Sequence, residues 1–344
     1  MSVQAVSPLL AITQGDSAGV GPELLLDLLA APPLDLRLLL IGEAAALDAA
    51  APGLERSGRA TSWRDGLIVG EGDFAAIRPG GPAVLERLGV ERRVEPGESQ
   101  KADAAGAVAC LDTGIELARA GSVQALVTGP VSKESIARHV LPGFRGHTDY
   151  IAEACGLERY GSDYLMTFLA ADLQVALLTT HLPLVEALRN LETEMILEAL
   201  ECLGRHAGGR IAVAGINPHA GEGGLLGRED GVIVAPAIEE GRRRGLDVHG
   251  PLSPDSLFAR ARSGEFDWVL ALYHDQGLIP VKTLAFGSAT NWTLGLPFLR
   301  TSVDHGTAFE IAGRGQADAR PLRRVLETTA SLFAGELPKK ASRA

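Results

Sequence analysis

Cysteine is scarce in this chain of 344 residues, with only three copies, at positions 110, 155 and 202. They are odd in number, far apart and without a CxxC pair, which argues against a disulfide framework or a zinc ribbon and fits a reducing cytoplasm. The first residues, Met1-Ser2-Val3-Gln4, show no basic segment ahead of an apolar core, so the sequence predicts no signal peptide.

Positive charge and long apolar runs are also lacking. Lys and Arg number 32 against 43 Asp and Glu, which gives a formal net charge of −11. Nucleic acid and anionic membranes both require a basic surface, so we expect neither as a partner. The most apolar stretch, residues 24–41, is interrupted by two prolines and three charged side chains, whereas a transmembrane helix needs about 20 predominantly apolar residues.

Short apolar runs alternate with segments of helical periodicity, which is typical of an α/β fold with a largely parallel sheet. The strand-like runs are residues 9–12, 36–41, 123–128, 164–169, 173–180, 211–214 and 268–272, and helices are expected from residue 22 and over 104–118, 196–203 and 322–333. The runs 164–169 and 173–180 are close enough to form a hairpin. At about 150 residues per domain, the length predicts two domains, and no linker separates them.

Three of the eight histidines share one context, because each closes an apolar strand-like run. His181 follows residues 175–180, His219 follows 211–217 and His274 follows 268–273. Ligands of open α/β sheets bind beyond the carboxyl ends of the strands, so three such imidazoles suit one metal ion with an open position. Three separate histidines, each bonded to a nearby carbonyl, explain the same pattern, and sequence order alone does not distinguish the two.

Two further segments suit ligand binding. Gly146-His147-Thr148-Asp149 precedes a helix-like stretch, with Thr148 or Asp149 as the N-cap, and a helix start with a histidine and a hydroxyl favours anions. Residues 217–224 place a proline and three glycines around His219, as in a loop that passes close to a ligand. Ordinary capping and a plain surface turn are the competing interpretations.

Polar and charged residues become frequent after His274. They are Asp275, Lys282, Asn291, Arg300, Asp304 and His305, interleaved with turns. Between residues 278 and 301 only Lys282 and Arg300 are charged, and isolated charges in an apolar stretch usually have a partner. In an acidic protein an anion such as phosphate suits this role. A solvated surface with a routine ion pair is the alternative.

The glycines near the N-terminus do not follow a nucleotide-binding pattern. They stand at positions 15, 19 and 21, which matches neither GxGxxG nor a P-loop. The sequence therefore predicts no Rossmann fingerprint.

With these residues assembled, the sequence resembles the 4-hydroxythreonine-4-phosphate dehydrogenase family of pyridoxal phosphate biosynthesis. The resemblance covers nearly the whole chain and is carried by seven blocks in the same order. The blocks are residues 13–23, 128–133, 146–148, 180–183, 217–222, 273–277 and 294–307, of which the last is the most specific.

The resemblance implies a two-domain α/β fold of the isocitrate/isopropylmalate dehydrogenase type, with a cleft between the domains. It also implies a homodimer whose active site forms between subunits. We expect a discontinuous first domain of residues 1–126 and 283–344. A second domain, residues 127–282, is expected to carry the metal histidines and the dimer contacts.

The site residues follow from the same resemblance. It assigns a divalent metal, zinc ahead of magnesium, manganese or cobalt, to His181, His219 and His274. Substrate contacts match His147, Thr148, Lys282, Asn291 and Arg300, and Asp255 and Asp275 match acidic residues near the same site. Lys282, desolvated by apolar neighbours, and Asp275 are rival proton acceptors. The NAD contacts are not assigned.

The family reaction is the NAD-dependent oxidation of the 3-hydroxyl of 4-phosphooxy-L-threonine, followed by decarboxylation to 3-amino-2-oxopropyl phosphate. The metal is expected to lower the pKa of the hydroxyl and to polarise the ketone. A sibling dehydrogenase acting on D-threonate or D-erythronate 4-phosphate is the nearest alternative. A metal-dependent decarboxylase or acyl-transfer enzyme without nicotinamide, and a non-enzymatic binding protein, are more distant ones.

Two departures from the family pattern carry expectations of their own. Gln14 and Ser17 stand where the family loop usually has prolines, which is expected to loosen the turn. Trp292 follows Asn291 where the family mostly has Ile or Val, and its large indole is expected to narrow the pocket.

Overall fold

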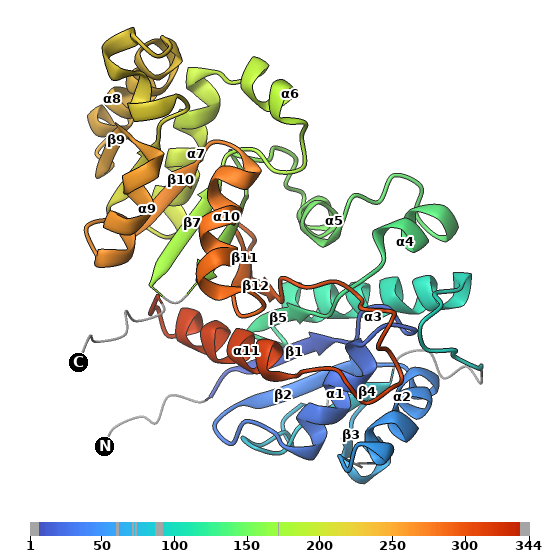
Figure 1. Cartoon of the computed structure of the whole chain (residues 1–344). Helices are drawn as coiled ribbons and strands as arrows, with labels where there is room; N and C mark the ends of the chain where they lie inside the picture. The colour runs from blue at the N-terminus through green and yellow to red at the C-terminus, as the bar shows by residue number, and fades with distance from the viewer. Residues whose placement is uncertain are drawn as a thin grey trace, which may run out of the picture. The chain divides into compact units, whose positions relative to one another are not determined.

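The computed structural model describes residues 7–59, 62–70, 72, 74–86, 92–170 and 172–337 (Figure 1). The ends of the predicted first domain, residues 1–6 and 338–344, lie outside the described residues. Two compact units are present, one made of the chain up to Cys155 together with Pro297–Glu336, the other of Gly156–Leu296. Each is a sheet covered by helices, so the predicted α/β class is confirmed. No helix among the described residues has the length and apolar character needed to cross a membrane.

The sheet of the first unit is entirely parallel. Its strands are β1 (Leu9–Thr13), β2 (Arg37–Gly42), β3 (Leu67–Ile68), β4 (Ala83–Glu86), β5 (Ala125–Thr128) and β12 (Leu299–Ser302), in the order β3-β4-β2-β1-β5-β12. In the centre, Ile12 pairs with Leu40 on one side and with Val127 on the other. Both faces of a parallel sheet are covered, which is why these strands are nearly continuous apolar runs in the sequence.

Helices cover both faces of this sheet. They are α1 (Gly21–Ala30), α2 (Ala44–Arg56), α3 (Lys101–Arg119), α4 (Lys133–His139), α5 (His147–Ala154) and α11 (Arg320–Phe333), with a short 3-10 turn at Trp63–Asp65. Helices α1, α2 and α11 share one apolar core with alternate residues of the strands, such as Ile12 and Val127. Helix α3 packs on the opposite face, where a Cβ on Gly114 would lie 2.6 Å from Leu126 Cδ1.

The second unit has a mixed sheet. Its strands are β6 (Leu165–Ala170), β7 (Leu173–Leu177), β8 (Ile211–Ala214), β9 (Val248–Leu252), β10 (Trp268–Ala271) and β11 (Thr290–Leu294), in the order β11-β6-β7-β10-β8-β9. Strands β11, β6 and β7 are antiparallel, whereas β7, β10, β8 and β9 run parallel. The predicted hairpin is confirmed as β6–β7, and residue 171 in its turn lies outside the described residues.

The helices of the second unit also form two layers. They are α6 (Leu184–Arg189), α7 (Thr193–His206), α8 (Ala235–Arg243), α9 (Pro254–Ser263) and α10 (His274–Ala285), together with a 3-10 segment η2 (Pro218–Gly224) and a π-helical segment η3 (Asp230–Val234). Helices α9 and α10 bury Leu257, Leu278 and Val281 against β6, β7, β8 and β10. Helices α7 and α8 lie on the other face (Figure 1).

The limits of the two units differ from the predicted domain boundaries. Residues 127–155 lie with the first unit, because Ile136 and Phe144 share a small apolar core with Ala104 and Val108 of α3. Residues 283–296 lie with the second unit, because β11 pairs with β6. The three metal-ligand candidates all lie in the second unit.

The loop between β1 and α1 is held by a buried polar network rather than loosened. Gln14 Nε2 donates to Glu43 Oε2 at 3.0 Å, and Ser17 Oγ donates to the same carboxylate. Arg92 Nη2 then pairs with Glu43 Oε2 at 2.8 Å. A Cβ on Gly15, whose φ is 76°, would lie 2.2 Å from the carbonyl oxygen of Pro130. The expectation of a loosened turn was therefore wrong, since both replacements gain hydrogen bonds that proline cannot make.

Candidate active site

The predicted site residues divide between the two units. Arg300, His147 and Thr148 lie in the first unit. The histidines 181, 219 and 274, with Asp255, Asp275, Lys282 and Asn291, lie in the second. Each group is described by itself.

Arg300 is the buried cation of the first unit. It lies on β12 with a side chain only 1% exposed, and its Nη2 donates to Thr128 Oγ1 at 2.6 Å. Burial lowers the pKa of its guanidinium to about 9, so it remains cationic at neutral pH. Burying a cation is costly, and negative charge bound beside it offsets that cost.

His147 and Thr148 occupy the first turn of α5. The N-cap is Gly146, whose φ of 139° suits only glycine, so the prediction that Thr148 or Asp149 caps the helix was wrong. Thr148 is buried, and His147 Nε2 is buried with no hydrogen-bond partner among the described residues. Burial, then the charges of Arg300 and Lys133, lower the pKa of His147 well below its usual range. His147 is therefore neutral at pH 7.

Lys133 completes this group, although sequence reasoning assigned it no role beyond its place in the family block 128–133. It is the first residue of α4, and its Cε and Nζ lie 2.9 and 3.2 Å from the position that a Cβ on Gly146 would take. The ammonium thus extends over the amino end of α5, where helix geometry already favours negative charge. We call Lys133, His147, Thr148 and Arg300 the anion group, because two cations and a helix start suit a phosphate or carboxylate.

The three candidate metal ligands follow three adjacent parallel strands. His181 comes after β7, His274 after β10 and His219 after β8, and these strands are neighbours in the order β7-β10-β8. Parallel neighbours place their carboxyl ends at the same edge of the sheet. All three histidines therefore belong to one edge of the second unit.

Two of these imidazoles are adjacent. The ring centroids of His181 and His274 lie 5.6 Å apart. His274 Nδ1 hydrogen-bonds to Asp275 Oδ1 at 2.7 Å, which fixes the ring and leaves Nε2 for a ligand. A cavity of about 220 Å³ is lined by Thr180, His181, Leu182, Leu184, Tyr273, His274 and Asp275.

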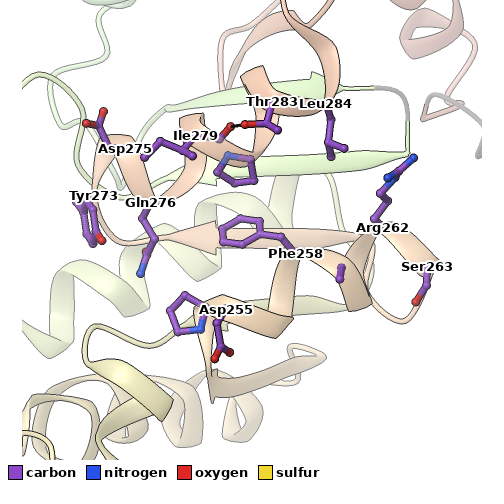
Figure 2. Close-up of a pocket in the computed structure, with 13 residues that line it drawn as sticks. Asp255, Phe258, Arg262, Ser263, Tyr273, Asp275, Gln276, Ile279, Thr283 and Leu284 are labelled. Carbon is purple, nitrogen blue, oxygen red and sulfur yellow. Dashed lines mark hydrogen bonds between the residues drawn. The ribbon is translucent and has the colours of Figure 1, made fainter.

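His219 lies on a separate loop, η2, with its Nδ1 3.8 Å from Asp255 Oδ2. Asp255 and Asp275 both line a second cavity of about 640 Å³ between α9 and α10. In Figure 2, Tyr273, Asp275 and Gln276 lie at one end of this cavity, and Arg262 and Ser263 lie at the other. Within the described part of the chain, no three metal-binding side chains come together as one group. A metal site shared by the three histidines therefore stays a prediction.

Lys282 and Asn291 lie in different surroundings. Lys282 is exposed on α10, a helix where we expected turns, so the desolvation predicted from its apolar neighbours in sequence is absent. Asn291 lies on β11, and its Oδ1 is buried without a hydrogen-bond partner among the described residues. Trp292 points to the opposite face of this strand and packs 6.1 Å from the ring of Trp268. Its indole therefore does not narrow the space on the Asn291 side.

Gln276 links two of the strand ends, although the sequence offered no sign of this beyond its place in a family block. It is buried on α10, where its Oε1 accepts from Leu272 N and its Nε2 donates to Gly215 O, each at 2.7 Å. It therefore fixes the segment that carries His274 to the end of β8, just before the loop of His219.

Fold and site define an α/β protein of two units. One unit carries the anion group, whose cations suit a bound anion, and the other carries a sheet edge with three imidazoles. The family model described as pyridoxal phosphate biosynthetic protein PdxA matches residues 37–329. The chain belongs to this family.

Individual relatives agree over nearly full length. A 4-hydroxythreonine-4-phosphate dehydrogenase of Acidithiobacillus ferrooxidans is 41% identical over 332 residues, covering 94% of this chain and 96% of the relative. A protein of Salmonella typhi, provisionally named a D-threonate 4-phosphate dehydrogenase, is 40% identical and covers 91% and 95%. The crystal structure of 4-hydroxythreonine-4-phosphate dehydrogenase from Klebsiella pneumoniae has a TM-score of 0.84 at 35% identity, covering 96% of this chain and 99% of that one.

Proposed function

We propose that this protein is an NAD-dependent, divalent-metal-dependent dehydrogenase of pyridoxal phosphate biosynthesis. It oxidises 4-phosphooxy-L-threonine at the 3-hydroxyl, and the resulting β-keto acid loses carbon dioxide to give 3-amino-2-oxopropyl phosphate. The observation that carries the proposal is the placement of His181, His219 and His274 at one edge of the sheet, after three adjacent parallel strands. Family membership and the names of the relatives support the same reaction.

The anion group binds negatively charged parts of the substrate. Arg300 offers a guanidinium already fixed by Thr128, and Lys133 offers an ammonium over the start of α5. Neutral His147 has a buried Nε2 with no hydrogen-bond partner in the described part of the chain, so this atom is available to a substrate oxygen. Because these side chains are already in place, substrate binding orders few of them and loses little entropy.

The three imidazoles fit a divalent ion of borderline softness, with zinc favoured and magnesium, manganese or cobalt as alternatives. The spacing of the His181 and His274 rings, and the Asp275 bond that leaves His274 Nε2 available, agree with this donor set. When bound, such an ion supplies positive charge that lowers the pKa of a hydroxyl and polarises a carbonyl, while NAD supplies the hydride acceptor.

We assign different roles to Asp275 and Lys282. Asp275 accepts the Nδ1 proton of His274 and so orients a ligand. That leaves Lys282 as the proton acceptor for the substrate hydroxyl, once bound substrate or the second subunit covers its exposed side chain. Asp275→Asn is then expected to lower metal affinity about 10- to 100-fold, the usual loss for a residue that orients a ligand. Lys282→Met is expected to lower kcat and leave metal affinity unchanged. If Asp275→Asn lowers only kcat and Lys282→Met lowers metal affinity, the two roles are exchanged.

A second copy of the chain completes the active site in this proposal. Large apolar side chains are exposed on the segments that follow the histidines, including Val185 at 57%, Leu225 at 84% and Phe286 at 85%. Such exposed apolar surface is typical of a subunit interface. Phe286→Asp is expected to convert a dimer to a monomer in light scattering, with loss of activity. A wild-type monomer with full activity would contradict the dimer.

NADH formation tests the reaction itself. Purified protein loaded with zinc is offered NAD with 4-phosphooxy-L-threonine, and separately with D-threonate and D-erythronate 4-phosphate. The main proposal predicts turnover of the threonine derivative with release of carbon dioxide. Turnover restricted to the sugar acids would support the second candidate, which the Salmonella typhi relative favours. Formation of product without formation of NADH would contradict both candidate functions.

A further inference from the structure

The loop that carries His219 has an uncommon backbone. In η2, five consecutive residues have positive φ: His219 at 54°, Ala220 at 52°, Gly221 at 79°, Glu222 at 42° and Gly223 at 67°. Residues with a Cβ disfavour this left-handed conformation and adopt it singly rather than in series. Three of the five residues are not glycine, so the surroundings must hold the turn in place.

Asp230, the first residue of η3, holds the turn in place through hydrogen bonds. Its side chain is 1% exposed, Oδ1 accepts from Ile216 N at 2.7 Å, and Oδ2 accepts from Asn217 N at 3.0 Å. Asn217 Nδ2 donates to the same oxygen at 2.9 Å. These three bonds to one carboxyl group fix the two residues before Pro218, directly ahead of the left-handed turn that begins at His219.

Close packing leaves the turn little freedom beyond these bonds. A Cβ on Gly215 would lie 2.9 Å from both Ala220 Cβ and Asp230 Oδ1, and a Cβ on Gly227 would lie 2.5 Å from Asn217 Nδ2. The turn is closed by Leu226 N, which donates to Gly221 O at 3.1 Å. The segment from residue 215 to 227 is therefore wrapped around the Asp230 carboxylate.

We propose that Asp230 is a positioning residue for His219. It does not contact the ligand of the imidazole; it stabilises the left-handed turn that presents the ring at the carboxyl edge of β8, beside Asp255. The inference rests on the proposed function only in taking the ligand to be a divalent ion.

Amide hydrogen exchange of the metal-free protein tests whether Asp230 stabilises the turn. Asp230→Ala is expected to speed exchange at residues 216–226 and to leave α7 and α11 at wild-type rates. The matched control is Glu229→Gln, because Glu229 is exposed and its side chain bonds to the loop through Asn217 Nδ2 at 2.9 Å. If Asp230→Ala does not fold, Asn217→Ala, which removes one of the three bonds, is expected to give a smaller change of the same kind. Wild-type exchange in a folded Asp230→Ala protein would overturn the proposal.

Zinc titration against a competing chromogenic chelator tests the consequence. Asp230→Ala is expected to weaken zinc binding about tenfold or more, Asp230→Glu to recover part of the loss, and Glu229→Gln to stay within about twofold of wild type. With the natural substrate, kcat is expected to fall more than KM rises. Unchanged zinc affinity in Asp230→Ala would overturn the positioning role. A wild-type protein that binds no zinc, yet shows the exchange difference, would contradict the metal in the proposed function and leave the hold on the turn established.

Discussion

The two groups of candidate residues are built in opposite ways. Arg300, in the anion group, is 1% exposed on a strand, and its neighbours occupy the first turns of two helices. We call the sheet edge with His181, His219 and His274 the histidine edge. There, the side chain of His219 is 61% exposed on a strained loop. The first group depends on ordinary secondary structure. In the second, Asp230 holds the segment before His219, Gln276 fixes the end of β10 to the end of β8, and Asp275 orients the His274 ring.

This difference bears on what each group needs before it can work. The anion group is preorganised, so its contribution to binding comes with little rearrangement. The histidine edge has two adjacent rings and a third on a separate loop. In the function we propose, a bound ion and a second subunit complete it. We therefore expect substitutions in the anion group to act on substrate binding, and substitutions at the edge to act on metal binding and chemistry.

The largest effect is expected from the histidines. His181→Ala, His219→Ala and His274→Ala should each lose the ion and lower kcat about a thousandfold, since metal assistance contributes several kcal/mol to the barrier. Metal analysis and NADH formation measure this, with His249→Ala as the control, because His249 lies near the amino end of strand β9 and not at the carboxyl edge. Retention of stoichiometric metal in two of the three variants would contradict a metal site shared by these histidines.

A smaller effect is expected from Arg300. Arg300→Lys keeps a charge but loses the planar fork, and bonds to charged groups contribute about 1.5–3 kcal/mol, so kcat/KM should fall about 10- to 100-fold. The loss should appear in KM, with metal content unchanged. Arg210→Lys, in a surface pair with Asp267, serves as the control. A loss confined to kcat would place Arg300 with the chemistry instead.

The pH dependence of stability tests the buried, neutral state of His147 in the anion group. The folded pKa of His147 is lowered, first by burial and then by Arg300 and Lys133, so the unfolded chain takes up a proton at higher pH than the folded one. Its favourable contribution is full above the unfolded pKa of about 6.5 and is lost as pH falls below that value. Melting curves from pH 8 to pH 5 should therefore decline less steeply for His147→Gln than for wild type. Parallel declines would contradict this assignment.

The smallest effect concerns backbone strain. Ala220 has a φ of 52°, a conformation that costs an alanine about 1 kcal/mol or more and glycine almost nothing. Ala220→Gly should therefore raise the free energy of unfolding by about 0.5 kcal/mol in chemical denaturation. Ala49→Gly, inside helix α2, should instead lower it by about 1 kcal/mol. Destabilisation by both would mean that the turn is not strained.

The sequence predicted the buried parallel strands well, because β1, β2, β5, β8 and β10 are continuous apolar runs. It missed β9, which contains Gly250 and Pro251, and β11, in which three of the five residues are polar. Helix α10 was missed because Gly277 and Pro280 normally interrupt helices. In each of these elements tertiary packing outweighs local preference.

For the candidate site, the sequence located the histidines at strand ends but not the residues that hold them. Asp230 lies eleven positions after His219, and only the folded chain shows its carboxylate beneath the turn. Lys282 illustrates the opposite failure, because apolar neighbours in sequence do not bury a side chain that faces outward on a helix. Contacts between distant segments are not encoded in local spacing.

Anomalous X-ray diffraction at the zinc edge, from crystals of the zinc-loaded protein, tests the proposed three-histidine site. We expect one strong peak per active site, about 2.1 Å from a nitrogen of each of the imidazoles 181, 219 and 274, whichever subunits supply them. A peak bonded to fewer than three of these rings, or no peak at this edge of the sheet in fully active protein, would contradict it.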